Sequence, residues 1–445
     1  MLNFFDILFG KKDAATLVYT GKSPAVIDTT TLATAKTHAI VGSIETNMHN
    51  TKYSDLVAWA KTHEFEIAQT ALNDTANMPK HHLMLRPACK GGCFALGPGC
   101  FGNMLPGEEV YVLGDTHGDF ESMVAILDTI LETAKYKGVE EPIVYMLGDI
   151  LDRNTETCMI ESVFILAILQ KALPEQFAQY NKIRLGIVKG DHDIGLSYNA
   201  MSTTNKFSAA VKPADYCDWL NDRLAKNSYK ETYTYIGRAW IRLMAECPSA
   251  AFLADSGTLL SHGGVPRIDL QQRMTSGEPY VMQSKEVAQD FEWCRMVDAK
   301  NKLLNRSSKT SEVGFQEFES FNALMGGKIR KFIFGHQHPA KGFMRFDKNY
   351  AGYDVICISS FRKDDTLGGP TIPYFCKIDK NDVNVYSMCP AKYIIRLEER
   401  STTTPPVAAK PAAPAPTAPV SRPPVATVAK PAAAATYTAG APSVK

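Results

Sequence analysis

The chain has 445 residues, of which 45% are hydrophobic and 21% charged, a composition typical of globular proteins with room for two or three domains. Its 48 Lys and Arg residues against 47 Asp and Glu residues leave a formal net charge of +1, so bulk charge predicts neither nucleic-acid nor membrane binding. No apolar run of about 18 residues predicts a membrane-spanning helix. Ten dispersed cysteines and the lack of a signal-peptide pattern favour a cytoplasmic location.

The first part of the chain, residues 1–105, is predicted to be an accessory region of unknown role. Residues 16–20 and 39–44 have strand-like composition, and residues 53–72 have apolar side chains at helical spacing. Near the end of this region lies a group of metal-binding residue types: His81, His82, Cys89, Cys93 and Cys100. Their spacing does not match a recognised zinc motif, so a glycine-rich surface loop is favoured over a structural zinc site.

From Glu109 onward, strand-like and helix-like segments alternate. Strands are predicted at residues 110–113, 143–147 and 183–188, with helices at 120–134 and 158–173 between them. A hairpin is predicted from residues 250–254 and 258–261, followed by a helix at 315–325 and by strands at 331–334, 354–359, 372–378 and 383–387. This order predicts an α/β domain over residues 106–398, with β-sheets flanked by helices.

Every histidine after position 82 belongs to a short glycine-marked motif that follows a predicted strand. The motifs are Gly114-Asp115-Thr116-His117-Gly118, Gly190-Asp191-His192-Asp193, Ser261-His262-Gly263-Gly264 and Gly335-His336-Gln337-His338, and Gly148-Asp149-Ile150-Leu151-Asp152-Arg153 adds two aspartates. Ligand sites of α/β folds lie at strand ends. The motifs therefore predict a dinuclear site with Asp115, His117 and Asp149 on one ion and with Asp149, Asp191, His262 and His336 on the other. Mixed nitrogen and oxygen donors favour manganese, with iron or zinc as alternatives.

The order of these motifs, together with His262-Gly263-Gly264-Val265-Pro266, resembles the calcineurin-like metallophosphoesterases, and most of all their serine/threonine phosphoprotein phosphatase branch. The resemblance spans residues 109–361. It implies a β-sandwich flanked by helices and a phosphomonoester hydrolase that uses metal-activated water. It also implies that Arg153 binds the substrate phosphate, that His192 protonates the leaving oxygen, and that Asp152 supports His192. Arg295, in Trp293-Cys294-Arg295, matches a second phosphate-binding arginine.

Two positions depart from the branch pattern. Asp191 stands where the branch has asparagine, and a carboxylate there is expected to bind the ion more tightly but to attract a phosphate dianion less. His338 completes a Gly-His-x-His pattern that is more typical of the wider superfamily, which makes it either an additional ligand of the first ion or a solvated neighbour. The substrate is therefore predicted to be a phosphoprotein, with a dinucleoside polyphosphate, another small phosphoester or a catalytically weakened scaffold as alternatives.

The end of the chain, residues 399–445, is predicted to be a disordered tail. From Ser401 onward it contains ten prolines, fourteen alanines and no acidic residue, and the pentapeptide Ala-Lys-Pro-Ala-Ala occurs twice. Such a composition cannot bury enough apolar surface to fold. A solvated spacer is the favoured interpretation, and docking to an acidic protein partner through Lys410, Arg422, Lys430 and Lys445 is the alternative.

Overall fold

The computed structural model describes most of the chain between residues 51 and 387. The described ranges are 51–73, 99–102, 108–153, 155–203, 206–226, 230–276, 284–299, 312–339, 342–346, 348–362, 373–378 and 383–387. The chain divides into two units, residues 1–399 and 400–445, and all described residues belong to the first. The strands predicted at residues 16–20 and 39–44, His81, His82, Cys89, Cys93 and the predicted tail lie outside the described residues.

One sheet has five strands in the order β15-β14-β2-β3-β4. Its bounds are β2 (Val110–Leu113), β3 (Ile143–Met146), β4 (Arg184–Ile187), β14 (Tyr374–Ile378) and β15 (Val383–Ser387). Strands β2, β3 and β4 are parallel neighbours, and β14 runs antiparallel to both of its neighbours, β2 and β15. The helices α5 (Phe120–Tyr136) and α6 (Thr155–Gln170) connect the three parallel strands, so the β-α-β order predicted from the sequence is confirmed.

The second sheet has six strands in the order β1-β7-β8-β11-β13-β12. Its bounds are β1 (Gly99–Gly102), β7 (Ala250–Leu253), β8 (Thr258–Ser261), β11 (Lys331–Phe334), β12 (Phe343–Arg345) and β13 (Asp354–Ile358). The predicted hairpin is the antiparallel pair β7 and β8, while β8, β11 and β13 are parallel. Two further small sheets pair β5 (Leu196–Tyr198) with β6 (Phe207–Ala209) and β9 (Arg295–Met296) with β10 (Glu312–Val313).

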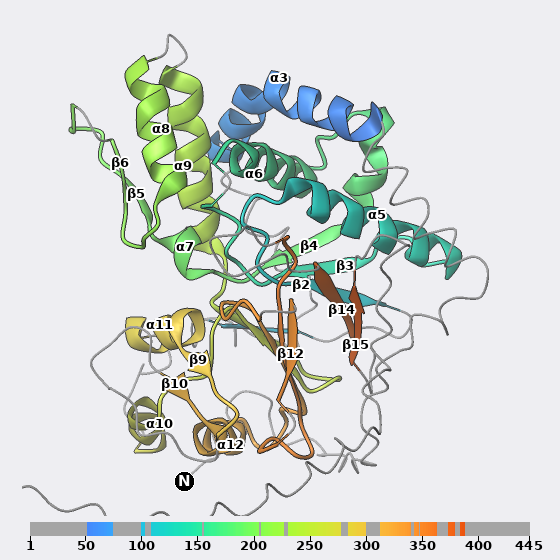
Figure 1. Cartoon of the computed structure of the whole chain (residues 1–445), viewed down its shortest axis with the longest axis vertical. Coiled ribbons are helices and arrows are strands. Elements are labelled where there is room, and N and C mark those ends of the chain that lie inside the picture. The colour runs from blue at the N-terminus through green and yellow to red at the C-terminus, as the bar shows by residue number, and fades with distance from the viewer. Residues whose placement is uncertain are drawn as a thin grey trace, which may run out of the picture. The chain divides into compact units, whose positions relative to one another are not determined.

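The two large sheets face each other and form a β-sandwich with helices outside (Figure 1). Alternate residues of one strand separate onto the two faces of a sheet: Val110 and Val112 of β2 contribute to the cluster between the sheets, while Tyr111 and Leu113 contribute to the helix-covered side. Because both faces are buried, the strands are continuous apolar runs rather than alternating ones. The predicted α/β class and the helix-flanked sandwich are confirmed.

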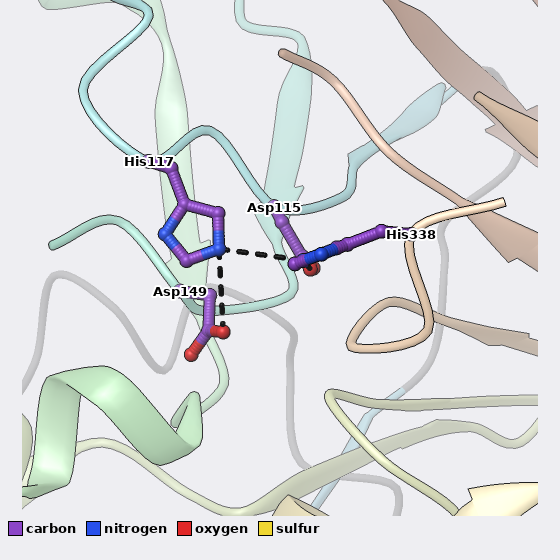
Figure 2. Close-up of side chains that lie close together, drawn as sticks. All are labelled: Asp115, His117, Asp149 and His338. Carbon is purple, nitrogen blue, oxygen red and sulfur yellow. Dashed lines mark hydrogen bonds and ion pairs between the residues drawn. The ribbon is translucent and has the colours of Figure 1, made fainter. Parts of the chain in front are cut away.

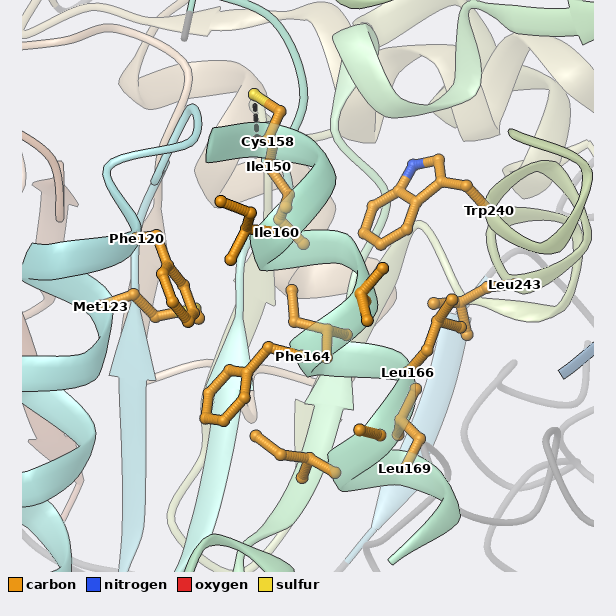
Figure 3. Packing of buried hydrophobic residues seen from close by; sticks show 14 of the residues in the cluster. Phe120, Met123, Ile150, Cys158, Ile160, Phe164, Leu166, Leu169, Trp240 and Leu243 are labelled. Atoms are coloured by element: carbon orange, nitrogen blue, oxygen red, sulfur yellow. Dashed lines mark hydrogen bonds between the residues drawn. The ribbon is translucent and has the colours of Figure 1, made fainter. Parts of the chain in front are cut away.

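Helices cover the outer face of each sheet. The five-stranded sheet packs against α5, α6, α8 (Asp215–Lys226) and α9 (Lys230–Glu246), with the 3₁₀ helix η2 (Glu175–Lys182) beside them. Residues of α10 (Ile268–Thr275), α11 (Lys285–Trp293) and α12 (Phe315–Leu324) pack on the six-stranded sheet. Figure 3 shows α6 in the first of these clusters, where Phe164 packs edge-on against Phe120 with ring centroids 5.2 Å apart. No single described helix is long and apolar enough to cross a membrane, although residues 157–170 with 175–182 pass that test as a pair bent by 75°.

The region predicted to be accessory, residues 1–105, contributes one helix and one strand to this domain. Helix α3 (Thr51–Asn73) lies against α6 and α9, and its Leu56, Trp59 and Ile67 are buried in the same cluster as α6. The Gln170 side-chain amide donates to the Ile67 carbonyl oxygen at 3.1 Å. Strand β1, which includes Cys100, pairs in parallel with β7. The domain boundary at residue 105 stays a prediction, yet the described elements before it pack into the core of the elements after it.

The packing of α3 generates a prediction. Leu56 is 0% exposed, so the variant Leu56→Ala is expected to lower the free energy of unfolding by about 2–5 kcal/mol, because it removes buried methyl groups and leaves a cavity. Urea denaturation followed by circular dichroism measures the change. The control Glu66→Ala, at an exposed position of the same helix, is expected to change stability by about 0.5 kcal/mol or less. Equal effects of the two substitutions would show that α3 is not part of the cooperative core.

Candidate functional site

The five motifs lie just after the carboxyl ends of five strands. Asp115, Asp149 and Asp191 follow the parallel strands β2, β3 and β4, while His262 and His336 follow β8 and β11 of the other sheet. Asp191 begins α7 (Asp191–Ile194), a single helical turn, instead of ending a strand. Asp115 also forms a parallel bridge with Ser359, which follows β13. The same end of both sheets therefore presents all five motifs to one region.

Two groups of side chains meet in this region. In each group one nitrogen or oxygen atom of every residue lies within 4.8 Å of all the others, and the groups are Asp115, His117, Asp149 and His338, and Asp149, Asp191, His262 and His336. All are buried except His338, which is partly exposed. The structure thus brings together all seven residues predicted as metal ligands, with Asp149 shared by both groups.

The first group is shown in Figure 2. The Nε2 atom of His117 lies 3.5 Å from Asp149 Oδ2 and 3.3 Å from His338 Nε2, which in turn lies 2.6 Å from Asp115 Oδ2. His117 Nδ1 donates to the Leu151 carbonyl oxygen at 2.8 Å, so the lone pair of a neutral ring is at Nε2 and faces the carboxylates. Of the two interpretations left open for His338, this contact favours the one in which it belongs to the first group.

The second group has a similar arrangement. His262 Nε2 lies 3.0 Å from Asp191 Oδ1 and 3.3 Å from Asp149 Oδ1, and His336 Nδ1 lies 3.3 Å from Asp191 Oδ1. His262 Nδ1 donates to the Leu147 carbonyl oxygen at 2.9 Å, which again directs Nε2 to the carboxylates. Clusters of histidine nitrogens and carboxylate oxygens of this kind fit divalent transition-metal ions, and a backbone carbonyl orients the ring of one histidine in each group.

The electrostatics of the cluster also fit cations. Burial, together with the nearby His338 and Arg153, holds the pKa of His117 well below its usual value, so its ring is neutral and free to act as a ligand. Burial opposes ionisation of Asp191, but the hydrogen bonds and charges of His262 and His336 keep its pKa below its usual value. Buried carboxylates that remain ionised need nearby positive charge, which protons on histidines or bound cations can supply.

Unusual backbone conformations concentrate at the same place. Seven non-glycine residues in the described ranges have positive φ, and six of them are predicted site residues: His117, Asp149, Asp152, Arg153, His336 and His338. Such conformations are costly for residues with a Cβ atom and are retained where the surroundings impose them. Residue 335 is a glycine because Asp115 lies against its backbone: a Cβ atom on Gly335 would overlap Asp115 Oδ1. The backbone is thus shaped around the side chains of the cluster.

The residues implied for phosphate chemistry lie beside the cluster. His192 Nδ1 and Asp152 Oδ2 are 2.6 Å apart, and Asp152 Oδ1 accepts from the Tyr216 backbone N–H at 2.9 Å. Burial disfavours charge on His192, but Asp149, Asp152 and Asp191 together raise its pKa to about 9, so the imidazole is protonated at neutral pH.

Arg153 has a buried Nε atom that lacks a hydrogen-bond partner among the described residues. A guanidinium N–H without a partner, beside the two His and Asp groups, fits an anionic ligand.

Arg295 is connected to the site through the residue next to it. It lies on β9 with an exposed side chain, and its neighbour Met296 is held by Gln337: the Met296 N–H donates to Gln337 Oε1 at 2.7 Å, and Gln337 Nε2 donates back to the Met296 carbonyl oxygen at 2.9 Å. The turn that carries His336 and His338 is therefore attached to β9. A phosphate-binding role for Arg295 stays a prediction.

Three supporting residues were missed by the sequence reasoning. Glu161 Oε1 accepts from Thr116 Oγ1 at 2.5 Å and holds the turn between Asp115 and His117, while Asp193 Oδ1 accepts from the backbone N–H groups of Ile150 and Leu151 at 3.1 and 3.2 Å. Gln337 is the third. A signal existed for Glu161, because it is the one charged residue in the apolar helical stretch 158–169.

No protein-family model matches the chain, and no curated protein sequence matches it. Among solved structures, a protein serine/threonine phosphatase from Saccharomyces cerevisiae is similar at 14% identity, covering 73% of this chain and 89% of that chain with a TM-score of 0.45. A cold-active protein tyrosine phosphatase is similar at 14% identity over 70% and 81% with a TM-score of 0.38, and a putative diadenosine tetraphosphatase at 12% over 65% and 97% with a TM-score of 0.30.

These likenesses are distant, with every TM-score below 0.5. The resemblance to the calcineurin-like metallophosphoesterases therefore rests on the five sequence motifs alone.

A further buried acid at the edge of the site generates a pH prediction. Glu292, at the end of α11, is 4% exposed, and burial raises its pKa from 4.5 to about 7 although Ser249 donates a hydrogen bond to it at 2.6 Å. Because the folded-state pKa is the higher one, the stability contributed by Glu292 is complete below about pH 4.5 and is lost as pH rises through about 7. Glu292→Gln is therefore expected to differ least from the unchanged protein below about pH 4.5 and to be more stable than it at pH 8, by at most about 3 kcal/mol.

Denaturation midpoints at the two pH values measure this difference. The control Glu231→Gln, at an exposed position of α9, is expected to give the same small change at both. A pH-independent effect of Glu292→Gln would contradict the assignment.

Proposed function

We propose that the chain is a dinuclear-metal phosphomonoester hydrolase and that its substrates are phosphoserine and phosphothreonine residues of proteins. The observation that carries the proposal is the pair of His and Asp groups that share Asp149, with Arg153 and the His192–Asp152 pair beside them. The donor set suits manganese, with iron or zinc as alternatives. A cytoplasmic location belongs to the same proposal, with the tail as a solvated spacer and docking of an acidic protein partner as the alternative.

The proposed chemistry divides between the cations and the protein. Two divalent cations, held by the two groups that share Asp149, would polarise a phosphoryl oxygen and activate a water molecule. Arg153 holds the phosphoryl oxygens through its guanidinium and offsets the charge that develops on them. His192 is kept protonated by Asp149, Asp152 and Asp191, and it donates that proton to the leaving oxygen, which would otherwise depart as an alkoxide. No side chain is needed as a nucleophile, so no covalent phosphoenzyme is expected.

A substrate panel tests the proposal. The protein is assayed with phosphoserine and phosphothreonine peptides, diadenosine tetraphosphate and p-nitrophenyl phosphate, with added Mn²⁺ and with a chelator. We expect metal-dependent release of phosphate from the peptides, with the chelator abolishing it. Faster turnover of diadenosine tetraphosphate than of the peptides would show that the substrate is a small phosphoester and not a phosphoprotein.

The third outcome of the panel concerns Asp191. Its carboxylate lies within the second group and weakens attraction for a phosphate dianion. No turnover with any metal in the unchanged protein, together with turnover in Asp191→Asn, would identify a scaffold that has kept the fold and lost the activity.

The role of His192 gives a separate prediction. His192→Ala is expected to lower kcat about 10²–10⁴-fold, because general acid catalysis is lost, while the metal content per chain stays unchanged. Steady-state kinetics with an alkyl phosphate and metal analysis of the same preparation measure both quantities. His63→Ala, in α3 and away from the motifs, is the control and should leave both unchanged. Loss of metal together with activity would mean that His192 acts through the cluster and not as an acid.

A further inference from the structure

The two groups of potential ligands have matched chemistry. Each contains one aspartate of its own, two imidazoles and the shared Asp149, and the private members are Asp115, His117 and His338 on one side and Asp191, His262 and His336 on the other. Affinity for a divalent ion depends first on the charge and type of the donors. On that measure the two positions are equal, each with two carboxylates and two imidazoles.

Asp149 directs one carboxylate oxygen to each group. Its Oδ2 lies 3.5 Å from His117 Nε2 in the first group, and its Oδ1 lies 3.3 Å from His262 Nε2 in the second. Its position is held by the backbone, since the Asp149 carbonyl oxygen accepts from the N–H groups of Thr116 and His117 at 3.2 and 2.9 Å. One oxygen therefore faces each group, and Oδ1 also accepts from the His192 backbone N–H at 3.0 Å.

Asp191 gives the second group the same number of carboxylates as the first. It is 4% exposed, and its Oδ1 lies 3.0 Å from His262 Nε2 and 3.3 Å from His336 Nδ1. A neutral amide oxygen at this place would leave the second group with one carboxylate against two in the first. The full negative charge of Asp191, in a buried site where charges interact strongly, removes that difference.

His338 has the corresponding effect in the first group. Its Nε2 lies 2.6 Å from Asp115 Oδ2, so it adds a second imidazole where His117 would otherwise be alone. His336 and His338 reach different groups because the residue between them, Gln337, is held on Met296 by two hydrogen bonds. The turn therefore supplies one imidazole to each position.

We propose that the two positions have nearly the same affinity for one divalent metal ion, so that the centre fills with two identical ions and does not sort two different metals. Asp191 and His338 are the residues that make the positions equivalent. This inference rests on the proposed function, because it assumes that the cluster holds two ions.

Anomalous diffraction measures the occupancy of each position directly. Crystals of the chelator-treated full chain are equilibrated with Mn²⁺ below saturation, and the manganese anomalous peaks near His117 and near His262 are compared. The unchanged protein is expected to give peaks that agree within about threefold, a small difference on a scale where each tenfold corresponds to about 1.4 kcal/mol. Calorimetric titration with Mn²⁺ in solution gives the total number of ions bound.

Two variants are expected to change the ratio of manganese occupancy at the two positions, in opposite directions. Asp191→Asn is expected to move manganese to the first position, and His338→Ala to the second, each by at least about tenfold. The matched control Asp222→Asn, on the exposed side of α8, should leave the ratio unchanged. Circular dichroism checks that each variant is folded.

The outcomes separate this inference from the proposed function. Two ions bound with strongly unequal peaks, or an Asp191→Asn variant whose ratio does not move, would overturn the equivalence while leaving the hydrolase intact. A protein that binds no manganese at either position and releases no phosphate would overturn both. Near-equal peaks with the two opposite shifts would establish equivalence, whichever phosphoester is the substrate.

Discussion

The contacts of Asp149 are the constraint on which the rest of the site depends. Its carbonyl oxygen accepts from two N–H groups of the turn after β2, and its Oδ1 accepts from the His192 N–H of the turn after β4 at 3.0 Å. It adopts a φ of 50°, which is costly for a residue with a side chain. One residue thus joins three parallel strand ends and places a carboxylate oxygen before each group of histidines. The geometry of both groups follows from that position.

Burying this many charged groups in one site costs free energy, and other parts of the fold offset that cost. The sandwich contributes apolar clusters on both faces of each sheet, and this apolar burial stabilises the fold around the polar centre. Around the centre, Glu161, Asp193 and Gln337 orient the turns through hydrogen bonds to neighbouring backbone and side-chain groups. A site built in this way is preorganised, which is the property that electrostatic catalysis and metal binding require.

Much of the fold could be predicted because it depends on local patterns. The helix at residues 120–134 and the strands at 331–334 and 383–387 have strong periodicity or continuous apolar runs, and the structure confirms them within a few residues. The packing of α3 could not be predicted. Its apolar face indicated a helix, but which surface that face contacts depends on α6 and α9, which lie about a hundred residues or more along the chain.

For the candidate site, the sequence by itself determined the residue types: five short motifs, each after a strand, with histidines and aspartates but no competing amines. Local chemistry was enough for this, since strand ends are recognisable and parallel strands end at one edge. Only the tertiary structure decided how those residues group. Whether His338 joins His117, and whether Asp191 faces His262 and His336, depend on the packing of one sheet against the other and on the attachment of Gln337 to β9. Such relations are distances between segments far apart in the chain, and no local pattern encodes them.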